Sequence, residues 1–397
     1  MTKERIIKAN PKYIQQFQKG FPLINKENVT SSIEHVEDGE IFKLVDNKNT
    51  FIAKGYFGIQ NKGIGWLLSW KEQEEIDKDF IFKKLQAAIN QRLHFFYSED
   101  TTAFRVFNGE GDGFGGITID YFDGYYLVQW YSKGAYSFHE EVMQSLRELT
   151  DFKGIYQKKR FAQEGKYVDE DDFVEGNRPS FPLLVKENGV QFAIYLNDGA
   201  MVGVFLDQRE VRKRIRDSYS EGKRVLNTFS YTGAFSVFAA LGGASLTTSV
   251  DLANRSLSKT IEQFSINGID YEAQNIIVED VFKYFKYAVK KELSFDLVIL
   301  DPPSFARSKK HTFSAAKDYK DLLKEAIAIT EKNGTIVAST NCSTFNMKKF
   351  KSFIEAAFKE TNGKYKILEE YTLPEDFKTL SQYKQSDYLK VAFIQKL

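Results

Sequence analysis

The stretch that decides the fold is VLNTFSYTGAFS, residues 225–236. The apolar pair Val225 and Leu226 leads into a small and polar turn that contains Gly233, and the apolar segment 237–241 follows. This order predicts a buried strand, a tight turn and a helix that runs back. Ligands of open α/β sheets bind outside the carboxyl ends of the strands, so the turn is the expected cofactor site. A dinucleotide fingerprint needs three spaced glycines, and Gly233 alone favours a smaller cofactor held by backbone and hydroxyl groups.

Three further predicted strands each end in an aspartate. Asp251 is placed to accept hydrogen bonds from ribose hydroxyls, and Asp280 suits a polar edge of a purine. One such aspartate is a weak signal, because Asp is also a common helix N-cap. Three in succession, with helices between them, fit S-adenosylmethionine. The strands with their aspartates are residues 247–251, residues 275–280 and residues 295–301, the last of which ends in Asp301.

Composition limits the classes of protein to consider. A chain of 397 residues predicts two or three domains. With 55 basic and 54 acidic residues the net charge is +1, which argues against a purely electrostatic nucleic-acid binder. The single cysteine excludes an internal disulfide and favours a reducing compartment. Without a membrane-length apolar run or a signal-peptide core in its first residues, the chain is expected to be cytoplasmic.

The order of elements predicts three parts. Residues 1–70 contain short candidate strands at 40–45, 49–55 and 65–69. Residues 71–190 contain helical spacing at 79–93 and 142–149 around a strand-rich stretch, 104–131. The glycines at 109–116 are interpreted as turns of an antiparallel sheet and not as a phosphate loop, because no GK[ST] or helix start follows.

The last part, residues 191–397, carries the α/β pattern. An added hairpin is expected between 192–196 and a partner strand around 202–205. Helices then alternate with strands through 335–340, and the final strands are expected at 366–373 and 388–395.

Four stretches resemble the RlmI-type bacterial ribosomal RNA methyltransferases, which methylate carbon 5 of a cytosine in large-subunit ribosomal RNA. The stretches are NGEGDGFGGITIDYFD (108–123), GVFLDQRE (203–210), VLNTFSYTGAFS (225–236) and LDPPSFARSK (300–309). The resemblance covers nearly the whole chain. It implies a small N-terminal PUA-like β domain (1–70), a β-rich middle α+β domain (71–190) and a class I methyltransferase domain (191–397) with a Rossmann-like seven-stranded sheet.

The resemblance also implies the ligands and the site. The cofactor is S-adenosyl-L-methionine and the partner is ribosomal RNA, with no metal and no membrane; a homodimer is left open. The expected catalytic residues are Cys342 and Asp301. The expected substrate-binding residues are Arg209, Pro302, Pro303 and Ser304. The expected cofactor-binding residues are Gln208, Asn227, Phe229, Tyr231, Thr232, Gly233, Asp251, Asp280 and Asp301.

Physical chemistry supports the pairing of Cys342 with Asp301. In the usual class I strand order, 3-2-1-4-5-7-6, the fourth and fifth strands are neighbours about 4.8 Å apart. Asp301 ends the fourth and Cys342 follows the fifth, so both are expected to face one pocket. A thiolate that adds at cytosine carbon 6 makes carbon 5 nucleophilic, and an acid that protonates ring nitrogen 3 assists the addition. Since the chain has no second cysteine, another base or water must remove the carbon 5 proton.

Other interpretations remain open at this stage. A lone cysteine is commonly buried filler, although the polar neighbours Asn341 and Ser343 favour a functional role here. Methyltransferases that act on amino groups use an Asp/Asn-Pro-Pro-aromatic motif, and Ser304 stands where that aromatic residue would be. An RNA base methyltransferase acting on nitrogen, guanine included, is therefore the nearest alternative. A non-catalytic RNA-binding assembly factor is the third, which the presence of all three aspartates with Cys342 argues against.

Overall fold

The computed structural model describes residues 4–60, 63–163, 166–167, 172–198, 202–307 and 312–397. The chain divides into two compact units, each of which includes segments distant in sequence. The first unit is Met1–Phe181, Tyr195–Val202 and Glu375–Ser386, and the second is Pro182–Ile194, Gly203–Pro374 and Asp387–Leu397. Among the helices within the described ranges, none has both the length and the apolar character needed to cross a bilayer.

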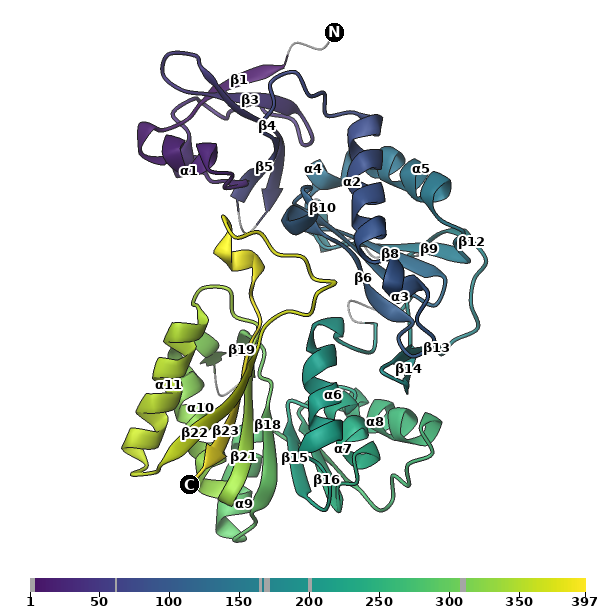
Figure 1. Ribbon diagram of the computed structural model, residues 1–397, viewed down its shortest axis with the longest axis vertical. Coiled ribbons are helices and arrows are strands. Elements are labelled where there is room, and N and C mark those ends of the chain that lie inside the picture. The colour runs from purple at the N-terminus through teal and green to yellow at the C-terminus, as the bar shows by residue number, and fades with distance from the viewer. Residues whose placement is uncertain (1–3, 61–62, 164–165, 168–171, 199–201, 308–311) are drawn as a thin grey trace. The chain divides into compact units, whose positions relative to one another are not determined.

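The second unit is built on a seven-stranded sheet (Figure 1). The strand order corresponds to 3-2-1-4-5-7-6 in chain order, as the sequence predicts, and only β23 runs antiparallel to its neighbours. This is the fold of a class I methyltransferase. Across the sheet the strands are β17 (Asn275–Val278), β16 (Leu246–Asp251), β15 (Arg224–Thr228), β18 (Phe295–Leu300), β21 (Thr330–Thr340), β23 (Lys390–Lys396) and β22 (Tyr365–Tyr371).

Helices cover both faces of this sheet, because its central strands are apolar on both sides. On β18, Val298 belongs to one apolar cluster, whereas Leu297 and Ile299 belong to another. The continuous apolar run of the strand is typical of a parallel strand buried on both faces. The first cluster includes side chains of α9 (Val281–Lys290), α10 (Ala315–Ile329) and α11 (Met347–Glu360), and the second includes side chains of α6 (Arg209–Ser218) and α7 (Ala234–Leu241).

The hairpin that precedes the sheet differs from the sequence prediction. It pairs β13 (Leu183–Glu187) with β14 (Val190–Ile194), so the predicted hairpin of 192–196 with 202–205 does not form, although the N–H of Tyr195 donates to the carbonyl oxygen of Val202 at 2.9 Å. The reason is the Asn188–Gly189 turn, in which both residues have positive φ, 49° and 81°. Positive φ at both central residues is what a two-residue type I′ hairpin turn requires, and Asn-Gly is its preferred sequence.

The first unit contains two five-stranded sheets. The N-terminal sheet has the order β1-β3-β4-β5-β2, and three of its strands match the predicted segments. The other sheet has the order β12-β9-β8-β7-β6, and its apolar face packs on α2 (Lys78–Gln91) and α5 (His139–Leu149). The bounds are β1 (Arg5–Lys8), β2 (Leu23–Ile24), β3 (Ile41–Val45), β4 (Phe51–Gln60), β5 (Gly63–Ser69), β6 (Ala103–Asn108), β7 (Ile117–Phe122), β8 (Tyr125–Trp130), β9 (Gly154–Lys159) and β12 (Phe173–Gly176).

The glycine-rich stretch lies between β6 and β7 and is a turn, as predicted. Its first part, Gly109–Asp112, forms a single 3-10 turn. Gly111 has no room for a side chain, because a Cβ atom there would lie 1.8 Å from the carbonyl oxygen of Lys378. The turn is therefore shaped to accept a segment that is distant in sequence.

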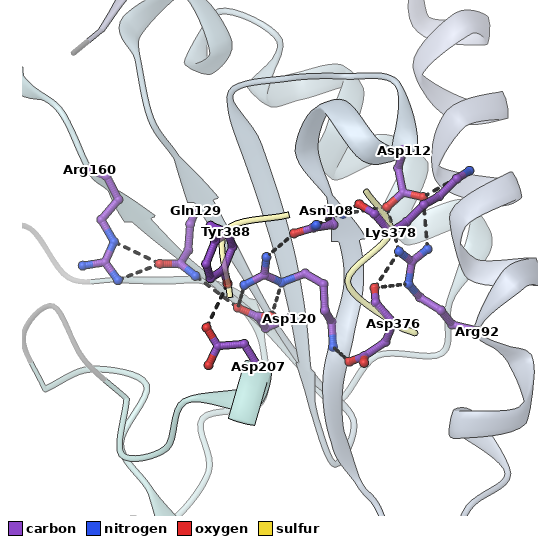
Figure 2. A network of polar contacts seen from close by, with 11 residues as sticks. Arg92, Asn108, Asp112, Asp120, Gln129, Arg160, Asp207, Asp376, Lys378 and Tyr388 are labelled. Atoms are coloured by element: carbon purple, nitrogen blue, oxygen red, sulfur yellow. Dashed lines mark hydrogen bonds and ion pairs between the residues drawn. The ribbon is translucent and has the colours of Figure 1, made fainter. Parts of the chain in front are cut away.

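That segment, Glu375–Ser386, is here called the strap, and it belongs to the first unit although it joins β22 to β23. Arg92 holds it in place, donating from Nε (2.9 Å) and Nη2 (2.7 Å) to the carbonyl oxygen of Asp376 (Figure 2). The same guanidinium forms an ion pair with Asp112 at 2.8 Å, and both side chains are almost fully buried. Asn108 also donates to the carbonyl oxygen of Lys378, at 2.9 Å. The strap is thus bound through its backbone and also through side chains, since Oδ2 of Asp376 accepts a hydrogen bond of 2.8 Å from the N–H of Arg105 and the buried ring of Tyr383 packs against Phe21 and Trp66.

Candidate active site

The turn after β15 has an unusual backbone conformation. Phe229 and Tyr231 have φ of 55° and 52°, in the left-handed region that aromatic residues rarely adopt. Gly233 has φ of 79°, and a Cβ atom there would lie 2.6 Å from Cγ2 of Thr260. Such strain is usually found at functional sites. The turn lies at the carboxyl end of β15, where Ser230 and Thr232 are buried and Phe229 and Tyr231 are partly exposed.

Hydrogen bonds from neighbouring segments hold this turn. The backbone N–H of Tyr231 donates to Oδ2 of Asp251 at 2.9 Å, and the N–H of Ala253 donates to Oδ1 at 2.9 Å. Each carboxylate oxygen keeps a further lone pair, which a pair of ribose hydroxyls can use. Thr232 donates from Oγ1 to the carbonyl oxygen of Gly203 at 2.7 Å. These contacts fit the predicted role of Asp251 toward the ribose of S-adenosylmethionine.

A pocket of about 260 Å³ opens beside the turn, close to the lower end of the range for small-molecule sites, roughly 300 Å³. All of its lining residues belong to the second unit. It brings together seven residues that the sequence assigned to the site: Gln208, Phe229, Tyr231, Asp251, Asp301, Pro302 and Pro303. The other lining residues are Val204, Phe205, Asp207, Arg212, Ser230, Ala234, Phe235 and Asn341.

Asp301 follows β18 and lies in the polar part of the pocket. Its Oδ1 accepts a hydrogen bond of 3.0 Å from Nε2 of Gln208, which also donates to Oγ of Ser339 at 2.7 Å. Desolvation raises the pKa of Asp301 to about 6, and the nearby charge of Asp207 acts in the same direction. Hydrogen bonds from Ser339 and Gln208 and the charge of Arg212 oppose that pKa increase only in part. A carboxyl group with a pKa near neutrality is suited to exchange a proton with a substrate.

Cys342 follows β21, but its side chain is not among those that line the pocket. It is 6% exposed and packs in the apolar cluster of α10 and α11. Its Sγ lies 3.1 Å from Oγ1 of Thr344, and its carbonyl oxygen accepts a hydrogen bond of 2.8 Å from Nζ of Lys390. The preceding residue, Asn341, does line the pocket. The nucleophile predicted from the sequence is therefore next in sequence to a lining residue, but its own side chain does not line the pocket.

Other predicted residues have structural contacts at the edge of the site. The Asp280 carboxylate accepts from the N–H groups of Phe282 and Lys283 and so forms the N-cap of α9, beyond the end of β17. This is the capping role that the sequence left as an alternative, and a contact of Asp280 with the cofactor stays a prediction. Ser304 donates to Oδ1 of Asn341 at 2.5 Å. Arg209 is buried with Nε 3.1 Å from Oε1 of Glu210.

Asn227 is 1% exposed at the end of β15. Its Nδ2 donates to Oγ of Ser236 at 3.0 Å, whereas its Oδ1 is buried without a partner among the described residues. Neither Asn227 nor Gly233 lines the pocket.

The sequence analysis missed Arg212, Phe205 and Phe235. Arg212 forms a buried ion pair with Glu187 of β13, at 2.6 Å, and donates from Nη2 to the carbonyl oxygen of Phe205 at 2.6 Å. It lies four residues after Gln208, so both can face the pocket from the start of one helix. The i, i+4 spacing from Gln208 was the sequence feature that could have identified Arg212. Glu187 could not have been found, because the hairpin that carries it was misplaced.

Within the described ranges, no group of three or more His, Cys, Asp or Glu side chains is placed to hold a metal ion.

Models of known families match two stretches of the chain. A family model for S-adenosylmethionine-dependent methyltransferases matches residues 105–380, and a PUA-like domain model matches residues 7–70. A Bacillus subtilis (strain 168) protein, "Putative ribosomal RNA large subunit methyltransferase YwbD", is 60% identical over 394 residues, which are 99% of this chain and 100% of that protein. Ribosomal RNA large subunit methyltransferase I of Aliivibrio fischeri is 30% identical over 356 residues, 89% of this chain and 90% of that protein.

A solved structure shares the architecture. The crystal structure of SMU.776 complexed with SAH is 37% identical, covers 99% of each chain and superposes with a TM-score of 0.90.

Proposed function

Because this chain belongs to the S-adenosylmethionine-dependent methyltransferases, and within them to the RlmI-type family, we propose that it methylates carbon 5 of a cytosine in large-subunit ribosomal RNA. The relatives' names support ribosomal RNA as the substrate, and the PUA-like domain supports binding to RNA. The observation that carries the choice of atom is the pairing of Asp301, with its raised pKa, and Cys342 at the ends of the neighbouring strands β18 and β21.

In the proposed mechanism the Cys342 thiolate forms a bond to cytosine carbon 6, while Asp301 delivers a proton to ring nitrogen 3. S-adenosylmethionine supplies the electrophilic methyl group. After transfer, a base or water takes the carbon 5 proton, the electron pair of that C–H bond restores the C5–C6 double bond, the thiolate leaves carbon 6, and ring nitrogen 3 returns its proton to Asp301. For the first step the thiol must exchange its contact with Thr344 for one with the base, since the Cys342 side chain does not line the pocket.

The alternative, methylation of a ring or exocyclic nitrogen, is favoured by one observation. The Cys342 side chain is absent from the pocket lining, whereas Asp301 and Pro302 are present, and a carboxylate beside a backbone carbonyl can orient an amino group. In that reaction Cys342 is a packing residue and no covalent bond forms between the protein and the RNA.

Mass spectrometry separates the two functions. Ribosomal RNA from a strain that lacks the gene is incubated with the purified protein and labelled cofactor, then digested to nucleosides. Label in 5-methylcytidine supports the proposed function, and label in an N-methylated nucleoside contradicts it.

A further inference from the structure

Gln208 is unusual among the pocket residues because only half of its amide is satisfied. Gln208 is buried, with only 3% of its surface exposed. Nε2 has two acceptors, Asp301 Oδ1 at 3.0 Å and Ser339 Oγ at 2.7 Å. Oε1 is buried and has no hydrogen-bond partner among the described residues. A buried acceptor left unpaired is unfavourable, so a ligand is the natural source of the missing donor.

The orientation of this amide follows from Asp301. A carboxylate can only accept hydrogen bonds, so the amide nitrogen must face it whenever Asp301 is ionised. This fixes Oε1 on the other side of the same planar group. The two residues together then present two hydrogen-bonding positions, an acceptor on Gln208 and an exchangeable proton on Asp301.

We infer that Gln208 is the residue by which the site selects cytosine, with Oε1 accepting a hydrogen bond from the exocyclic 4-amino group. The inference rests on the proposed function, because it assumes that Asp301 meets ring nitrogen 3. The 4-amino group is a donor next to that nitrogen, which matches an acceptor next to the acid. Uracil has a carbonyl oxygen at the same position, and two acceptors would then face each other.

This assignment moves Gln208 from the cofactor to the substrate. Sites that hydrogen-bond a substrate group discriminate strongly against an analogue that lacks it, because their own buried polar atoms are left unpaired. Nε2 remains a positioning group for Asp301, and Ser339 shares that task. Oε1 of Gln208 thus affects the choice of base, whereas Nε2 affects the position of Asp301.

The test compares two RNA substrates that are identical except at the target position. One carries cytosine and the other carries pyrimidin-2-one, which lacks only the 4-amino group. The measured quantity is the ratio of kcat/KM for the two RNAs in the wild type and in Gln208→Met. Intrinsic reactivity of the analogue cancels when the ratios of two variants are compared.

We expect Gln208→Met to shift this ratio toward the analogue by roughly 10–100-fold, with S-adenosylmethionine affinity unchanged in calorimetry. Ser339→Ala is the matched control. It removes a partner of Nε2 and leaves Oε1, so it should slow both RNAs alike and keep the wild-type ratio. If Gln208→Met does not fold, Gln208→Asn retracts the same amide by one methylene and should shift the ratio in the same direction.

An unchanged ratio in a folded Gln208 variant overturns the inference, as does a loss of cofactor affinity with the ratio intact. Failure of the proposed function is seen separately, in the wild type, which would then yield no 5-methylcytidine from the cytosine RNA.

Discussion

Arg92 and Asp301 are both ionisable groups in confined surroundings, but the protein treats them in opposite ways. Every N–H of the Arg92 guanidinium donates a hydrogen bond. Nε and Nη2 donate to the carbonyl oxygen of Asp376, Nη1 donates to that of Ala88, and Nη1 and Nη2 each donate to the carboxylate of Asp112. Asp301 has hydrogen bonds from two neutral side chains, and its pKa is raised to about 6. A fully paired buried charge fixes a segment in place. An incompletely compensated one remains free to take up a proton, which is what a catalytic acid requires.

The first prediction is the loss of activity in Asp301→Asn. The amide cannot deliver a proton to the ring, so we expect methylation to fall by about 10²–10⁴-fold, the usual contribution of general acid–base catalysis. The variant should remain folded and should bind S-adenosylmethionine, because the Asn oxygen can still accept from Gln208. Single-turnover assays measure the loss. Asp296→Asn, near the opposite end of β18, should leave the rate unchanged; near wild-type activity in Asp301→Asn would refute the role of the acid.

The second prediction concerns the strap and stability. Arg92→Ala removes the buried cation that pairs with Asp112 and leaves Lys378, at 3.8 Å, as its charged neighbour, which should lower the free energy of unfolding by about 3–5 kcal/mol. Denaturant titration of the full-length protein and of the full-length variant measures this change. The exposed pair of Arg147 with Glu175 offers a matched control, for which Arg147→Ala should cost about 0–1 kcal/mol. Equal effects of the two substitutions would show that the buried ion pair does not hold the strap.

The third prediction is a pH-dependent stability difference at Asp301. The pKa is raised from 3.8 to about 6, so the folded state binds the proton more tightly than the unfolded chain. The contribution of Asp301 to the free energy of unfolding of the wild type therefore falls as the pH rises from about 4 to about 6, by up to about 3 kcal/mol. Asp301→Asn lacks this pH-dependent contribution. Melting curves of the cofactor-free proteins should coincide near pH 4, and the variant should be the more stable one above pH 7. A constant difference across this range would contradict the raised pKa.

Much of the second unit could be predicted from the sequence. The apolar strands and their terminal aspartates correctly indicated the α/β sheet and the location of the pocket, because these features depend on short-range patterns. The strand order was expected from the class I methyltransferases, and the structure has that order. The hairpin was misplaced since the Asn188–Gly189 signal was overlooked. The strap was not foreseen, because its contacts with Arg92 and Asn108 join residues more than 250 positions apart.

Side-chain orientation was the part of the site that the sequence did not determine. The spacing correctly placed Asp301 and Cys342 at the ends of adjacent strands. It did not indicate that Asn341 would line the pocket while Cys342 packs against apolar residues. Consecutive residues after a strand point in different directions, and tertiary packing decides which of them faces the ligand. The same limit applies to Asp280, where helix capping and cofactor binding use the same atoms.

The proposed mechanism requires a covalent bond between Cys342 and the target base, and this bond can be trapped. RNA with 5-fluorocytosine at the target is incubated with the protein and S-adenosylmethionine, then analysed by denaturing electrophoresis and peptide mass spectrometry. Fluorine does not leave as a proton does, so the adduct should persist with the RNA attached at Cys342, and Cys342→Ser should give neither adduct nor appreciable turnover, because a hydroxyl is far less ionised than a thiol near neutral pH. Substantial methylation by Cys342→Ser, with no adduct in the wild type, would contradict the account and favour methylation on nitrogen.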